Sequence, residues 1–117
     1  MKKILWVSRH QMTNEQLNDL HRIYGEFSLT QFDQTVETIE SFLTFHADVY
    51  AVVLPLQLLA DLKKATDAEI IQPVSGRVRT ESAKYHNQAS DTLETEYIFK
   101  HLYWQKINRL ELETEKL

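Results

Sequence analysis

The chain has 117 residues, of which 43% are hydrophobic, and its formal net charge is −4 at pH 7. This length fits one domain over residues 1–117 with a real hydrophobic core, and the few glycines and prolines exclude a linker or low-complexity chain. The negative charge argues against binding of duplex nucleic acid, which depends on Lys and Arg contacts to phosphates. The absence of cysteine excludes a disulfide framework, a thiolate nucleophile and a cysteine-ligated zinc site.

No secretory or membrane segment is predicted. Lys2 and Lys3 are followed by the short apolar run 4–7, which is too short for the apolar region of a signal peptide. The longest run without charge, 49–60, contains Pro55 and is shorter than the roughly 20 residues that a membrane helix needs. We therefore expect a cytoplasmic protein that has no membrane partner.

Apolar runs and helical spacings alternate along the first two thirds of the chain. The apolar runs predict buried strands at residues 3–8 and 49–54, an edge strand at 27–33 and a weaker strand at 69–74. Helical spacing predicts helices between them, from the capping box at Thr13 to Gly25, over 35–46, and from Pro55 to Leu62.

This alternation predicts a three-layer α/β domain with a mainly parallel sheet of order 2-1-3-4. The second and third helices should cover one face of the sheet and the first helix the other. Residues 79–93 are polar and predict a long loop. An extended C-terminal segment is expected over 96–104 and 109–113, with a helix through 97–110 as the alternative. This aromatic segment, or a second subunit, should complete the cover of the first helix's face.

The strongest functional signal is the sequence Ser8-Arg9-His10, which directly follows the first buried strand. In the predicted sheet the chain reverses direction between the first and third strands, and ligands bind at such a point outside the carboxyl ends of the strands. The fork of Arg9 suits phosphate or carboxylate oxygens, and His10 could transfer a proton near neutral pH. The alternative is structural: Ser8 ends a strand, Arg9 pairs with an acidic neighbour and His10 is solvated.

Further polar residues are predicted at the same edge of the sheet. Gln57 follows the third strand, and Ser75, Gly76 and Arg77 follow the fourth as a turn, so we expect these four residues to bind the ligand. Asp33 is the acidic residue expected to approach this edge. No Walker sequence, GxGxxG motif or metal-binding pair of histidines is present, so neither a cofactor nor a metal is expected.

Two motifs carry a resemblance to a known family. Val7-Ser8-Arg9-His10 after the first strand and VLPLQLLA at 53–60 resemble the small stand-alone CRISPR-associated ring nucleases of Rossmann-like (flavodoxin-like) fold. The resemblance covers about residues 3–62, and the chain is also similar to uncharacterised small proteins of prophages and other mobile elements. It implies metal-independent cleavage of a cyclic oligoadenylate across the two-fold axis of a homodimer. Ser8, Arg9 and His10 match the catalytic motif, and a ribose 2′-hydroxyl would attack the adjacent phosphate.

Three functions therefore stay open from the sequence. The first is a ring nuclease that binds a small anionic ligand, a cyclic oligoadenylate. The second is a noncatalytic module that senses or sequesters a nucleotide, or inhibits a defence protein. The third is a homo-oligomeric interaction protein that uses its aromatic C-terminal surface, in which case a local carboxylate should neutralise Arg9.

Overall fold

The computed structural model describes residues 1–87 and 92–109, with the backbone alone over 78–99 of these ranges. Its elements in chain order are β1 (Lys2–Val7), α1 (Asn14–Tyr24), β2 (Phe27–Phe32), α2 (Glu40–Leu43), β3 (Val49–Val52), α3 (Leu56–Ala65), β4 (Glu69–Asn87) and β5 (Thr92–Lys106). None of the described helices is long and apolar enough to cross a membrane.

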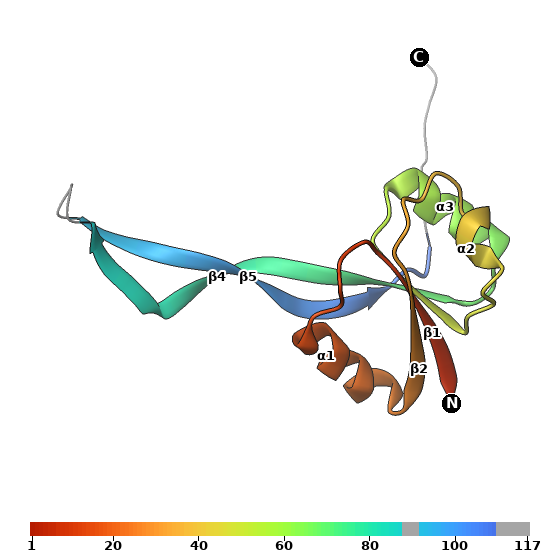
Figure 1. The fold of residues 1–117 in the computed structure, drawn as a ribbon, viewed down its shortest axis with the longest axis horizontal. Coiled ribbons are helices and arrows are strands. Elements are labelled where there is room, and N and C mark those ends of the chain that lie inside the picture. Colours follow the sequence, from red (N-terminus) through yellow and green to blue (C-terminus); the bar gives the residue numbers. More distant parts are fainter. Residues whose placement is uncertain (88–91, 110–117) are drawn as a thin grey trace, which may run out of the picture.

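One five-stranded sheet connects these elements, in the order β2-β1-β3-β4-β5 (Figure 1). The neighbours from β2 to β4 run parallel, whereas β4 and β5 are antiparallel. The predicted α/β class and mainly parallel sheet are therefore confirmed. The fifth strand, β5, is the extended segment that was expected over residues 96–104.

Strand β3 and the second part of β1, residues 4–7, are buried because their side chains are apolar. On one face of the sheet, Leu5 and Val52 pack with Phe42 of α2 and Leu62 of α3. The other face forms a second core of buried residues from α1, β5 and the sheet: Ile4, Trp6, Leu20, Val49, Ala51, Ile71 and Trp104. The predicted distribution of the helices over the two faces is thus confirmed, and Trp104 contributes the cover expected from the C-terminal segment.

Helix α1 begins and ends as the sequence predicts. The Thr13 hydroxyl accepts a hydrogen bond from the Gln16 amide at 3.1 Å, and the Gln16 side chain accepts one from the Thr13 amide at 2.9 Å. This capping box satisfies amides that have no partner within the helix. Gly25 ends the helix with φ of 74°, a conformation that favours glycine.

Helix α2 is much shorter than the predicted helix over 35–46. Its N-cap, Ile39, has no side chain that can accept a hydrogen bond from the first turn. The Ser41 hydroxyl instead donates to the Thr38 carbonyl at 2.7 Å, a local bond that competes with helix formation. His46 then takes a positive φ of 49°, which is incompatible with a continuing helix. Because α2 begins only at Glu40, residues 33–39 form a loop beside the carboxyl edge of the sheet.

The predicted loop over residues 79–93 is also wrong where the structure describes it. Residues 79–87 belong to β4 and residues 92–93 to β5, while 88–91 lie outside the described residues. The antiparallel register runs from Ile71 opposite Lys106 to Asn87 opposite Thr92. A polar sequence can form this hairpin because the two backbones satisfy each other's hydrogen bonds without an apolar core.

The hairpin extends far beyond the rest of the sheet. Strand β4 pairs with β3 only from Glu69 to Ile71, so β4 and β5 continue together as a two-stranded arm (Figure 1). Arg109 follows β5 outside any strand, and the remainder of the predicted extended segment 109–113 lies outside the described residues.

Candidate functional site

A small hollow lies where β1 and β3 end, at the position predicted for a ligand. Its volume is about 150 Å³, and its lining combines polar and apolar residues: Val7, Ser8, Arg9, Gln34, Thr35, Val36, Val53, Leu54 and Pro55. We call it the Arg9 crevice. The loop before α2 forms its third side, next to the ends of β1 and β3. Because one wall is polar and another apolar, the crevice can contact both a charged group and a ring or sugar.

Several hydrogen bonds fix the loop that carries Arg9. The Gln31 side-chain amide of β2 donates to the carbonyls of Ser8 and His10, both at 3.0 Å. The Trp6 indole N–H donates to the same His10 carbonyl at 2.8 Å, and the His10 amide donates to the Ser8 hydroxyl oxygen at 3.1 Å. The backbone on both sides of Arg9 is therefore held, while its side chain projects from a fixed position.

The part of the chain that the structure describes does not neutralise the positive charge in this crevice. Arg9 is exposed and has no hydrogen-bond or ion-pair partner among the described side chains, those of residues 1–77 and 100–109. None of the described carboxylates lines the crevice. Pro55 is the N-cap of α3 and gives no side-chain cap to the first turn, so the first amides of this helix also favour an anion. The alternative in which a local carboxylate neutralises Arg9 finds no support in the described part of the chain.

The structure separates three of the predicted residues from the crevice. His10 is exposed and does not line it, although Ser8 and Arg9 do. Gln57 lies in the first turn of α3, but its amide donates to the Asp61 carboxylate at 3.2 Å. Asp33 follows β2 and accepts a hydrogen bond from the Gln34 amide at 3.0 Å, outside the lining.

The predicted turn Ser75-Gly76-Arg77 does not exist. These residues lie inside β4, where Ser75 is opposite His101 and Gly76 is opposite Lys100. A Cβ atom at Gly76 would lie 2.6 Å from the Leu102 side chain, so this glycine allows Leu102 to approach the backbone rather than forming a phosphate loop. The prediction failed because β4 continues past the end of β3 instead of turning there.

The sequence analysis does not predict the crevice residues that come from the loop before α2. Gln34, Thr35 and Val36 line it only because residues 33–39 form a loop. The polar run Asp33-Gln34-Thr35 and the absence of a capping side chain before α2 were the available signals.

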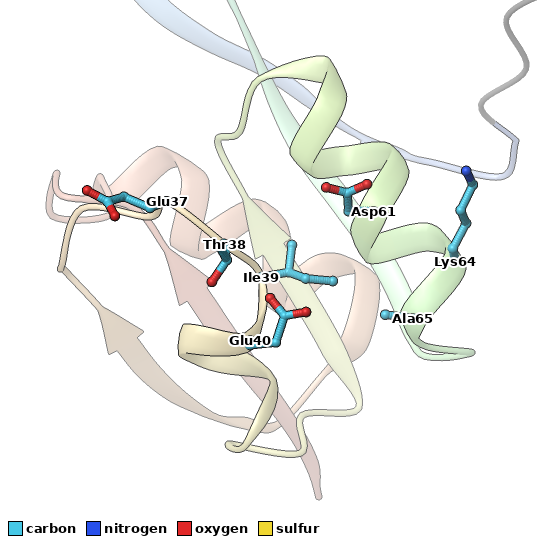
Figure 2. Close-up of a pocket in the computed structure, with 7 residues that line it drawn as sticks. All are labelled: Glu37, Thr38, Ile39, Glu40, Asp61, Lys64 and Ala65. Carbon is cyan, nitrogen blue, oxygen red and sulfur yellow. The ribbon is translucent and has the colours of Figure 1, made fainter.

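A larger hollow of about 470 Å³ lies between the loop before α2 and α3, and it has the wrong charge for an anion (Figure 2). Its lining includes the carboxylates of Glu37, Glu40 and Asp61 and one ammonium group, that of Lys64. Figure 2 shows the Glu37 carboxylate directed away from α3, so the acidic groups do not converge. No group of metal ligands occurs among the described residues.

A partly buried polar cluster joins α1 to the base of the arm. The Asp19 carboxylate contacts His101 Nε2 of β5 at 2.9 Å and the Arg22 guanidinium at 2.8 Å, and the His101 side chain is only 5% exposed. The hydrogen bond with His101 lowers the pKa of Asp19 below its usual value, against the opposing effect of burial, and Arg22 lowers it further. This cluster holds α1 in place but lies apart from the crevice lining.

Asp19 should make the protein less stable in acid. Because its pKa is lower in the folded chain, the unfolded chain binds more protons, and the stabilisation is lost as pH falls below about 3.8. We expect Asp19→Asn to lower the stability near neutral pH and to make stability depend less on pH in this acidic range. Urea unfolding of both proteins between pH 2.5 and pH 7 measures this difference. Equal pH dependence in the two proteins would contradict the assignment.

In comparisons with known proteins, no family model, curated protein or solved structure matches this chain.

Proposed function

We propose that the Arg9 crevice binds a phosphate group of a nucleotide. The observation that carries this proposal is an arginine without a partner among the described residues, on a hollow without carboxylates. The uncapped start of α3 adds backbone donors beside it. Because the backbone on both sides of Arg9 is fixed by hydrogen bonds, its guanidinium can bind two phosphate oxygens through parallel hydrogen bonds.

The proposed ligand is a cyclic oligoadenylate, and the proposed fold type is Rossmann-like. Both rest on the resemblance of residues 3–62 to ring nucleases, and a mainly parallel sheet with helices on both faces supports the fold type. The crevice volume of about 150 Å³ is small beside the roughly 300–1,000 Å³ of drug-sized ligand sites. One crevice would therefore contact one nucleotide unit of the ring, with its phosphate at Arg9 and its sugar or base against Val53 and Leu54.

Binding without cleavage is the second candidate, and the position of His10 favours it. In the cleavage proposal the ribose 2′-oxygen bonds to phosphorus and the bond from phosphorus to the 5′-oxygen breaks, which leaves a 2′,3′-cyclic phosphate and a 5′-hydroxyl. Arg9 stabilises the charge that develops on the phosphate, and His10 moves the proton of the 2′-hydroxyl to the leaving 5′-oxygen. His10 is exposed and outside the crevice lining, so it would have to turn towards the bound phosphate. A sensing or sequestering module requires Arg9 but not His10.

One experiment distinguishes these candidates. The purified full chain is incubated with cyclic tetra-adenylate and cyclic hexa-adenylate in EDTA, with binding followed by calorimetry and products by chromatography. Linear products that disappear in Arg9→Ala and His10→Ala would establish cleavage without a metal. Binding that persists in His10→Gln without any product would establish the binding module. Neither binding nor products would overturn the proposal for these ligands.

A further inference from the structure

Strand β2 is an edge of the sheet that the described part of the chain leaves open. It pairs in parallel with β1 over its full length, from Lys2 opposite Phe27 to Val7 opposite Phe32, without a register shift. No described strand pairs with its outer side. Alternate residues of such a strand present backbone N–H and C=O groups outward, so a further strand can add to the sheet there.

The usual protections of an edge strand are missing from β2. Its sequence, FSLTQF, contains no charged residue, no proline and no bulge. Soluble proteins commonly use these features to prevent strands of other molecules from pairing. The opposite edge strand, β5, does carry charged residues, Lys100 and Lys106, and has a register shift opposite Val74 and Ser75.

Exposed side chains flank this edge on both faces of the sheet. Phe27 packs against the core beneath α1. Because side chains alternate along a strand, Leu29 lies on the same face as Phe27, and Leu29 is 39% exposed. Ser28 and Thr30 lie on the other face, where they line a hollow of about 280 Å³ with Phe45, which is 49% exposed. The short α2 leaves this face open.

We infer that β2 pairs antiparallel with β2 of a second copy of this chain, about a two-fold axis at Leu29. In this register Leu29 lies opposite its own copy, and Ser28 lies opposite Thr30 in both directions. An apolar pair thus meets on the face of α1 and two hydroxyl pairs meet on the other face, which are favourable cross-strand combinations. The strand is therefore complementary to itself, as a two-fold interface requires, and it carries no charge that would repel a copy.

This arrangement determines where the two crevices lie. Antiparallel pairing reverses the direction of the strands, so the carboxyl edges of the two copies point to opposite ends of the joined sheet. Each Arg9 crevice would act alone, whereas the resemblance to ring nucleases implies a site shared across the two-fold axis. The inference does not rest on the proposed function, because a monomer could bind nucleotide at Arg9 equally well.

Cysteine crosslinking tests the register. The chain contains no cysteine, so a single introduced thiol can react only with its copy. Directly opposite residues in an antiparallel pair have Cα atoms about 4.5–5.5 Å apart, within the range of a disulfide, whereas Thr30 would lie about 8 Å from its copy. We expect Leu29→Cys to form a disulfide-linked dimer on mild oxidation and Thr30→Cys to stay largely unlinked. The inference would be overturned if only Thr30→Cys formed a disulfide-linked dimer, or if neither variant formed one.

Light scattering tests the interface without crosslinks. We expect the wild-type protein to reach twice its mass of 13.8 kDa as concentration rises. Leu29→Lys places like charges opposite each other and should weaken the dimer roughly ten-fold or more. Tyr103→Lys is the matched control, since Tyr103 is 50% exposed on the opposite edge strand, and it should leave the dimer unchanged.

Each contrary result has a definite meaning. A wild-type protein that stays monomeric, or a Leu29→Lys variant that dimerises normally, would overturn the inference. Dissociation by Tyr103→Lys alone would assign the interface to β5 instead. Circular dichroism of both variants verifies that they fold, as their exposed positions lead us to expect.

Discussion

Arg9→Ala is expected to weaken nucleotide binding about ten- to hundred-fold, because it removes a charge-assisted hydrogen-bond donor from the phosphate. Its side chain has no partner among the described side chains of residues 1–77 and 100–109, so the substitution should leave the stability of the fold nearly unchanged. Arg9→Lys should recover only part of the affinity, since an ammonium group lacks the planar fork of arginine. Calorimetric titration with cyclic tetra-adenylate measures all three affinities.

Arg22→Ala provides the matched control for this prediction. Arg22 is also exposed, but it contacts Asp19 on α1 and lies outside the crevice lining. We expect its removal to leave nucleotide affinity unchanged. An equal loss of affinity in both variants would show that the ligand responds to overall charge and not to the Arg9 crevice.

Trp104→Ala is expected to lower the free energy of unfolding by about 3–5 kcal/mol, the usual cost of removing a large buried aromatic side chain. Trp104 packs edge-to-face on Trp6 with ring centroids 5.8 Å apart, and its indole N–H donates to the Gln16 carbonyl of α1 at 3.0 Å. It therefore joins β5 to both α1 and the centre of the sheet. Urea unfolding, followed by circular dichroism, measures the change.

Tyr103→Ala, at the neighbouring position in β5, is the control for Trp104→Ala. Tyr103 is half exposed, so Tyr103→Ala should cost much less than Trp104→Ala. If the two substitutions destabilise the protein equally, the burial of Trp104 beneath α1 is not what holds β5 to the body. Loss of Trp104 should also remove the ring that packs on Trp6, whose indole donates to the His10 carbonyl.

The centre of the fold follows from local sequence. Strands β1 and β3 form from continuous apolar runs, and Thr13, Gln16 and Gly25 determine the ends of α1 through their own side chains and backbone. These signals lie within a few residues of the structure they specify. The predicted helix over 35–46 is wrong because apolar spacing alone does not start a helix, and no side chain caps the N-terminus of α2.

The hairpin depends on partners that are distant in sequence. Strands β4 and β5 stabilise each other through backbone hydrogen bonds. Neither strand has an apolar periodicity from which its length can be predicted. The sequence therefore predicts a turn at Ser75, Gly76 and Arg77, although β4 continues through them. Ser8 and Arg9 lie beside the ends of β1 and β3, because the parallel sheet fixes where those strands end.

The side chain of His10 shows the limit of motif reasoning. The motif places it next to Arg9 in sequence, but the Gln31 and Trp6 hydrogen bonds hold only its backbone carbonyl. The orientation of its ring is not determined by any described hydrogen bond. Whether it reaches a bound phosphate thus depends on the ligand, which is why the His10 variants separate cleavage from binding.

The most direct test is nuclear magnetic resonance of the full chain, labelled with nitrogen-15 and titrated with cyclic tetra-adenylate. We predict that the backbone amides of Ser8, Arg9, Gln34 and Leu56 shift together, because they surround the Arg9 crevice and the start of α3. The Arg9→Ala protein should show these shifts only at much higher ligand concentration. Shifts confined to Glu37, Glu40 and Asp61, or no shifts in the wild-type protein, would contradict the assignment of the Arg9 crevice as the nucleotide site.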